Sequence, residues 1–212
     1  MKTSQLIDTL VADPSPRGLS LGARFCLALG AGALVSLCFF MATVGPRSDI
    51  ANAAHTLRFD LKFVDTLALA LPAALLAWRL LRPDARPGAL ALTFLAPFLL
   101  LGGAVVAELM LVPANLWGTK LIGSNAIHCL TIIPLLSIAP LAALLFVMRE
   151  GAPRHPGIAG ALAGAAAAGV AATLYASNCP DDSPLFVASW YPLATLVVAA
   201  VGAFAGDRFL RW

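Results

Sequence analysis

The chain has 212 residues, of which 60% are hydrophobic and only 12% are charged, and its formal net charge is +3. A soluble domain of this size is about a quarter charged, since its surface faces water. The composition therefore excludes a soluble globular protein and predicts one whose surface is mostly covered by lipid. In a membrane protein a small positive charge is expected from Lys and Arg on cytoplasmic loops, so it gives no support to nucleic-acid binding.

Six apolar segments are long enough, or nearly so, to cross a bilayer. A spanning helix needs about 20 apolar residues, and open strands are excluded because their backbone groups would lack partners in lipid. We therefore predict an all-α fold, a six-helix transmembrane bundle. The first segment exceeds the apolar core of a signal peptide, so we expect it to remain in the protein. The segments are Phe25–Val44, Phe63–Leu81, Gly88–Val112, Ala126–Met148, Gly157–Ser177 and Leu185–Ala205.

Charged residues within these segments are few. The second segment contains Asp65 and Arg79, which we place near its ends, where charged side chains reach the headgroups. The third is uncharged until Glu108. Because buried ionisable groups mark ion and substrate paths, this pattern gives little support to transport. A small-molecule or ion transporter of the inner membrane is nevertheless kept as the alternative function.

Small residues recur at four-residue spacing in the last two segments. Gly160, Gly164 and Ala168 form one such stripe, and Gly202 and Gly206 form another. Stripes of this kind let helix backbones approach closely. We expect them to pack helices within the bundle rather than to form a dimer interface.

Lys and Arg are unevenly distributed between the two sides of the predicted bundle, and the richer side of short loops is cytoplasmic. We therefore expect both termini in the cytoplasm and loops 45–62, 113–125 and 178–184 on the outer side. Ten are on the richer side: Lys2, Arg17, Arg24, Arg79, Arg82, Arg86, Arg149, Arg154, Arg208 and Arg211. Four are on the other: Arg47, Arg58, Lys62 and Lys120.

The segment before the first apolar run carries an amphipathic pattern. Leu6, Ile7, Leu10 and Val11 fall on one face of a short helix, which the run Asp13–Pro16 ends. Such a helix suits docking into a groove of a partner protein, and it also suits lying on the bilayer surface. From the residues alone, both interpretations stand.

The four cysteines divide by depth. Cys26 and Cys38 lie about 18 Å apart along one predicted helix, so they cannot bridge each other and are interpreted as small packing residues. Cys129 and Cys179 are both expected at the outer face, where disulfides persist. They are interpreted as a structural bridge or as a redox or metal sensor, without the CxxC motif of thiol-exchange enzymes.

A soft-metal site is a further hypothesis for the same face. Its ligands would be His128, Cys129, Cys179 and Asp181, although their spacing matches no standard zinc pattern. His55, Glu108 and Asp182 are expected on this face too. The sequence contains no phosphate-binding glycine loop, HExxH motif or Ser/His/Asp grouping at one depth, so we predict no enzyme activity and no cofactor.

Several stretches together resemble one known family. They are Lys2–Leu10, Ala12–Pro14, Cys129–Ser137, Asn178–Val187 and Arg208–Trp212. The chain is similar in these stretches to the negative-regulator-of-sigma-F (NrsF) family of membrane anti-sigma factors.

The resemblance implies a six-helix inner-membrane protein that holds an extracytoplasmic-function (ECF) sigma factor inactive, and a cysteine pair that responds to metal or oxidative stress. It assigns that pair to Cys129 and Cys179. It also implies that residues 1–23 form a cytoplasmic sigma-docking segment, followed by a transmembrane domain at 24–212. Within that segment the sigma-binding residues would be Leu6, Ile7, Leu10, Val11, Asp13 and Pro14.

Overall fold

The structure is a computed structural model that describes Thr3, Gln5 and residues 18–211. Leu6, Ile7, Leu10, Val11, Asp13 and Pro14, on which the predicted docking segment rests, lie outside the described residues. The described chain is helical throughout and contains no strand. The elements are α2 (Leu21–Thr43), α3 (Ile50–Ala53), α4 (Leu57–Arg79), η1 (Gly88–Phe94), α5 (Leu95–Leu111), η2 (Ala114–Leu116), α6 (Trp117–Ile122), α7 (Ala126–Met148), α8 (Pro156–Ala176) and α9 (Pro184–Phe209).

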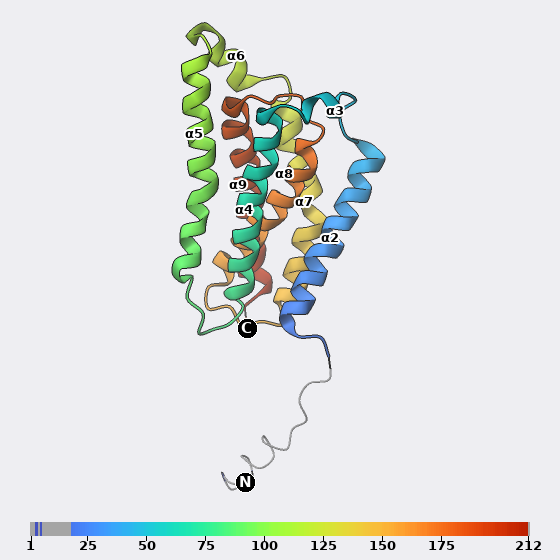
Figure 1. The fold of residues 1–212 in the computed structure, drawn as a ribbon. Coiled ribbons are helices and arrows are strands. Elements are labelled where there is room, and N and C mark those ends of the chain that lie inside the picture. The colour runs from blue at the N-terminus through green and yellow to red at the C-terminus, as the bar shows by residue number, and fades with distance from the viewer. Residues whose placement is uncertain (1–2, 4, 6–17, 212) are drawn as a thin grey trace.

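Six helical spans are long and apolar enough to cross a membrane, which confirms the predicted six-helix bundle. The third of them combines η1 and α5. The start of α2 and the end of α9 lie at one end of the bundle, here called the termini end (Figure 1). The opposite end, which carries α3, α6 and residues 177–183, is called the cysteine end.

Helix α8 lies at the centre of the bundle and packs against α4, α7 and α9. Because it is built mainly of Ala and Gly, neighbouring helices can approach its backbone closely. Helix α2 packs mainly on α7, and α5 stands at the opposite edge against α4 and α9 (Figure 1). Most side chains of α2 and α5 are exposed, as expected for helices that face lipid.

The two stripes of small residues meet inside the bundle, as predicted. A Cβ atom added at Gly160 would collide with the carbonyl oxygen of Gly202, and one at Gly206 would collide with that of Pro156. Gly164 lies equally close to the backbone of Val198. These glycines are therefore required by the close contact of α8 with α9.

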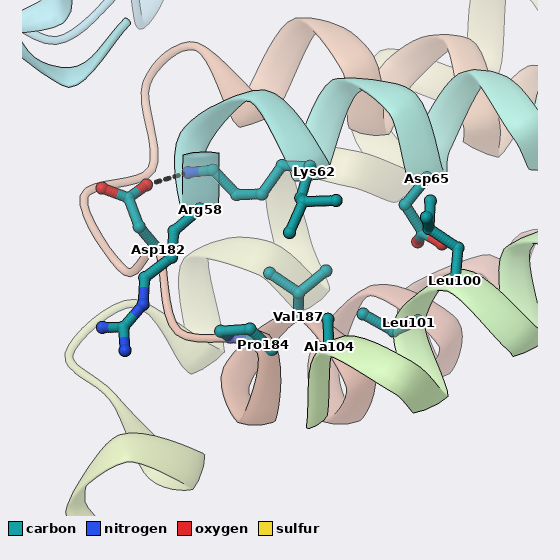
Figure 2. Close-up of a pocket in the computed structure, with 10 residues that line it drawn as sticks. Arg58, Lys62, Asp65, Leu100, Leu101, Ala104, Asp182, Pro184 and Val187 are labelled. Carbon is teal, nitrogen blue, oxygen red and sulfur yellow. Dashed lines mark ion pairs between the residues drawn. The ribbon is translucent and has the colours of Figure 1, made fainter. Parts of the chain in front are cut away.

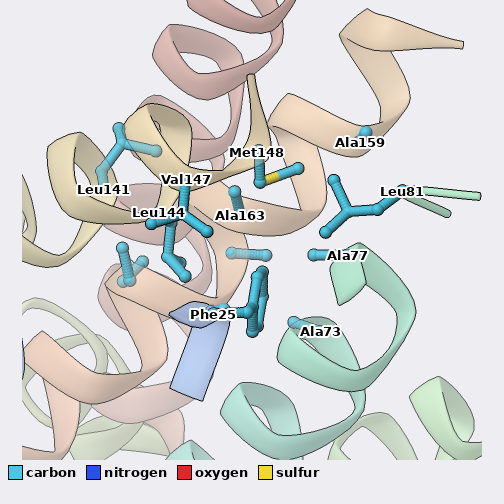
Figure 3. Packing of buried hydrophobic residues seen from close by; sticks show 14 of the residues in the cluster. Phe25, Ala73, Ala77, Leu81, Leu141, Leu144, Val147, Met148, Ala159 and Ala163 are labelled. Atoms are coloured by element: carbon cyan, nitrogen blue, oxygen red, sulfur yellow. The ribbon is translucent and has the colours of Figure 1, made fainter. Parts of the chain in front are cut away.

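Helix α7 and helix α2 are joined by an equally close contact. A Cβ at Gly32 would collide with the Cα of Pro140, and the buried Ser36 hydroxyl donates to the carbonyl of Leu136 at 2.6 Å. Near the termini end, Phe25 from α2 inserts among apolar side chains of α4, α7 and α8 (Figure 3). The two helices are thus connected along most of their length.

Two expectations about single residues are wrong. Cys26 and Cys38 are exposed on α2 instead of packed within the bundle. Helix α4 begins at Leu57, six residues before the predicted start, because Arg58 and Lys62 find acidic partners at the cysteine end. As a result Asp65 lies about 12 Å along the helix. It is buried there, only 9% exposed, and lies away from both ends of α4.

Candidate functional site

Cys129 and Cys179 lie together at the cysteine end. Cys129 belongs to the first turn of α7, and Cys179 lies in the loop between α8 and α9. Both side chains are fully buried and both thiols are free. The Cys129 thiol lies within hydrogen-bonding reach of the Cys179 sulfur. The Cys179 thiol itself donates to the carbonyl of Asp181 at 4.0 Å. The structure thus brings together the two residues that the sequence singled out as a pair.

The surroundings of Cys179 favour its thiolate form. The hydrogen bond from Cys129 lowers the pKa of the Cys179 thiol; burial opposes this, and the positive charge of Lys62 adds to the lowering. Since the thiolate is the form that attacks oxidants and binds metals, Cys179 is the partner of the pair that ionises more readily.

Both tyrosines of the chain lie next to the thiol pair. Tyr175 comes from α8 and Tyr191 from α9, and both are buried. Neither hydroxyl has a well-formed hydrogen bond within the described residues. Phe186 and Val187 complete the apolar wall. The pair is therefore closed off from solvent, so a reagent reaches it only if the covering loop moves.

The covering loop is held by a buried lysine. The Lys62 ammonium group donates to the carbonyl of Cys179 at 2.8 Å and pairs with the Asp182 carboxylate at 2.5 Å (Figure 2). Arg47 also pairs with Asp182, at 2.9 Å. One carboxylate thus ties the loop both to α4 and to the segment after α2. Removing one partner of a buried pair typically costs about 3–5 kcal/mol, and the second cation lessens that cost here.

Asp181 fastens the same loop to the start of α7. Its carboxylate accepts the backbone N–H groups of Ser124 and Asn125, each at 2.9 Å. These N–H groups precede the first turn of α7 and have no partner within the helix. The carboxylate therefore fixes the turn from which Cys129 projects.

Ser183 connects the loop to α5. Its hydroxyl donates to the carboxylate of Glu108 at 3.1 Å, and Glu108 pairs with Arg58 of α4 at 2.7 Å. Together with Asn178, whose amide donates to the carbonyl of Gly45, these bonds attach residues 177–183 to the segment after α2, to α4, to α5 and to the start of α7. This run is called the hub loop below. Its polar residues are explained by these contacts.

The proposed metal ligands are not assembled into a site. No group of three or more His, Cys, Asp and Glu side chains within the described residues is arranged to hold a metal ion. His128 is exposed although its neighbour Cys129 is buried, because successive residues of a helix point in different directions. Asp181 is occupied by the start of α7, and His55 is exposed.

Sequence reasoning missed several members of the site. Tyr175 and Tyr191 were overlooked, although they are the only two tyrosines of the chain. Their positions in the last two predicted helices already placed them near the cysteine end. Arg47, Arg58 and Lys62 were counted only for orientation. These are three of the four cations predicted on the outer side, where Asp181 and Asp182 were also expected. That combination of charges could have predicted the ion pairs.

The fold defines a multi-pass membrane protein, and the site is a buried thiol pair under a polar loop. Residues 10–212 match the protein family described as "Negative regulator of sigma F" (NrsF). The chain belongs to this family of anti-sigma factors, which confirms the resemblance found in the sequence.

Two relatives match over their whole length. The chain is 32% identical over 217 aligned residues to the "Probable anti-sigma-F factor NrsF" of Azospira oryzae, covering 100% of both chains. It is 32% identical over 220 residues to the "Anti-sigma-F factor NrsF" of Caulobacter vibrioides, again covering 100% of both. No solved structure matches the chain.

Proposed function

We propose that this anti-sigma factor holds an ECF sigma factor inactive at the inner membrane and releases it when the pair Cys129–Cys179 reacts on the periplasmic side with a soft metal ion or an oxidant. The observation that carries the proposal is the buried thiol pair beneath the hub loop. A closed pair in contact, next to a lysine that favours a thiolate, suits a sensor that responds to reagents of this kind.

Charge supports the orientation. The cysteine end carries few cations, and Arg47, Arg58 and Lys62 are each neutralised by a carboxylate. Of the described Lys and Arg residues most lie at the termini end, as on the cytoplasmic side of an inner-membrane protein. In this orientation residues 1–23 lie in the cytoplasm, where a sigma factor is available.

The chemistry of the signal follows from the two sulfur atoms. A two-electron oxidant takes two electrons and two protons from the thiols as the S–S bond forms. A soft metal ion instead displaces the protons and binds the thiolates. Either event replaces the hydrogen bond between the thiols. Because Cys129 is fixed to α7 and Cys179 to the hub loop, both events move α7 relative to α8 and α9.

Helix α7 leads from the thiol pair to the termini end. There the guanidinium of Arg24 at the start of α2 pairs at 2.6 Å with Glu150, which follows α7. Combined with the contacts of Gly32 and Ser36, this pair makes α2 follow α7. Since α2 begins at Leu21, within the proposed docking segment 1–23, a shift of α7 changes how Leu6, Ile7, Leu10, Val11, Asp13 and Pro14 are presented to the sigma factor.

Co-purification tests the proposal. The full-length protein and a variant that lacks residues 2–12 are purified from native membranes in parallel. A sigma factor that accompanies only the full-length chain supports sequestration by the N-terminal segment. If no sigma factor accompanies either chain, the proposed function is wrong.

A further inference from the structure

An apolar cavity of about 260 Å³ lies between α4, α5, α8 and α9. This is near the lower end of the range typical of small-molecule sites, about 300 Å³. Phe94, Pro97, Phe98 and Leu101 form the wall contributed by η1 and α5. Of α5 only Pro97 and Glu108 are buried, so this helix stands between the cavity and the lipid. Anything that enters the cavity comes from the bilayer.

Two polar groups without partners line the cavity. The carboxyl oxygen Oδ1 of Asp65 is buried and has no hydrogen-bond partner within the described residues. Lys62, one turn earlier, points instead to Asp182 (Figure 2). The Tyr191 side chain is only 3% exposed, and its hydroxyl, which lies next to Cys179, has no well-formed hydrogen bond in the described chain. Leaving such groups unpaired costs about 1–3 kcal/mol each.

A small cavity lies between Asp65 and the ion pairs of the cysteine end. It measures about 10 Å³, space for at most one water molecule (Figure 2). The two cavities share Asp65 and Leu101. Asp65 therefore lines both cavities, and only the larger one has room for more than a water molecule.

The chemistry of the walls selects the ligand. The lining residues include no Lys, Arg or His, so fatty-acid anions and anionic phospholipids find no counter-charge there. A site about 12 Å below the start of α4 also lies too deep for a zwitterionic headgroup. The two unpaired groups call for a neutral head that donates to Asp65 and accepts from Tyr191. A hydroquinone ring has hydroxyl groups that do both, and an isoprenoid tail suits the apolar wall.

We propose that the cavity between α4, α5, α8 and α9 binds an isoprenoid quinol from the bilayer, with Asp65 and Tyr191 as hydrogen-bonding partners of its ring hydroxyls. Tyr191 also touches the thiol pair, so the ligand and the pair share a wall residue. The inference does not depend on the proposed sigma-factor function, because binding is measured without any sigma factor.

Titration of the purified full-length protein tests this inference. The protein is placed in nanodiscs of quinone-free phospholipid and titrated with decylubiquinol in calorimetry. We expect saturable binding that Asp65→Leu and Tyr191→Phe each weaken by at least about tenfold, as for a lost hydrogen bond to a charged or buried group. Asp60→Asn, which alters an exposed carboxylate on the same helix, should bind as the parent does.

Three outcomes would overturn the proposal. They are absence of saturable binding to the folded parent, undiminished binding in both variants, and equal, Asp65-dependent binding of dioctanoylglycerol, which would assign the cavity to neutral lipids. Circular dichroism checks that each variant is folded. If Asp65→Leu does not fold, Tyr191→Phe decides alone, since it removes only one oxygen atom.

Discussion

At the scale of single residues, the thiol pair is set apart from the other cysteines by burial and by neighbours. Cys38 is exposed on α2, whereas Cys129 and Cys179 are fully buried in contact with each other. Replacing Cys129 by Ser keeps a small donor beside Cys179 but prevents both disulfide formation and two-thiolate metal binding. The variant should therefore repress the sigma factor normally and fail to release it.

A reporter gene transcribed by the sigma factor measures this, with a soft metal ion or an oxidant added to growing cells. Cys129→Ser should give the uninduced level under both conditions, while Cys38→Ser should respond as the parent does. Normal induction in the Cys129 variant would remove the cysteine pair from the signalling mechanism.

The acidity of Cys179 gives a second prediction at this scale. Its pKa is lowered chiefly by the hydrogen bond from Cys129, so the thiolate forms at a lower pH than in an ordinary cysteine. Alkylation of Cys179 by iodoacetamide should accordingly reach half its maximal rate at a pH below that of a free thiol. Replacing Cys129 by Ala removes the donor and should move this midpoint to higher pH.

The rates are measured on purified protein in which Cys26 and Cys38 are replaced by Ser, so that their exposed thiols do not contribute. Mass spectrometry of the peptide that contains Cys179 follows the reaction. A midpoint that Cys129→Ala leaves unchanged would show that the hydrogen bond does not set the acidity.

At the scale of helices, the sequence predicted the structure correctly where the length of an apolar segment or the spacing of small residues determines it. The bounds of α7, Ala126–Met148, agree with the predicted segment, and Gly160 and Gly202 meet as expected. The start of α4 was predicted too late because Lys62 is charged, and a hydropathy pattern ends an apolar segment at a charged residue. The buried position of Lys62 depends on Asp182, a residue 120 positions later, whose location no local pattern reveals.

The same limit applies to the candidate site. The predicted topology placed Cys129 and Cys179 at the same face of the membrane. It could not show whether the two side chains touch each other. Asp65 was predicted to lie near a helix end. Only the observed start of α4 at Leu57 shows that it lies more than two turns into the helix.

The contact between α8 and α9 gives a prediction about stability. Gly160→Ala places a methyl group against the backbone of α9 and should destabilise the bundle by about 1–3 kcal/mol, the usual cost of overpacking. Gly103→Ala in α5 is the matched control, because a Cβ there meets nothing within 4 Å. It should be neutral or stabilising by up to about 1 kcal/mol, as Ala favours a helix interior. Thermal unfolding in detergent, followed by circular dichroism, compares the two; equal midpoints would contradict the close contact.

At the scale of the whole molecule, the two ends of the bundle have different chemistry. At the cysteine end, ion pairs and hydrogen bonds of the hub loop hold α4, α5 and α7 around two thiols. At the termini end, Arg24 and Glu150 join the start of α2 to the end of α7. Since α2 and α7 also pack closely along their length, the thiol pair is mechanically connected to the point where the N-terminal segment begins.

This connection can carry a signal only if the N-terminal segment holds the partner. Placing charges on the predicted apolar face of that segment tests this. Leu6 and Leu10 lie one helical turn apart on the predicted apolar face, and burying each yields about 1.5–3 kcal/mol. Replacing both by Asp removes that gain and places two charges in the interface. The sigma factor should then be active without any signal, although the protein still enters the membrane, since all six apolar spans are unchanged.

The matched control carries the same two charges at the same spacing on the other face, as Gln5→Asp with Thr9→Asp. Reporter transcription and the amount of protein in the membrane fraction are measured for both double variants. Constitutive transcription in the Leu6/Leu10 variant alone would locate the interface on the apolar face. Because a surface helix would instead lose its hold on the bilayer while repression persisted, unchanged repression in both variants would favour membrane binding over docking.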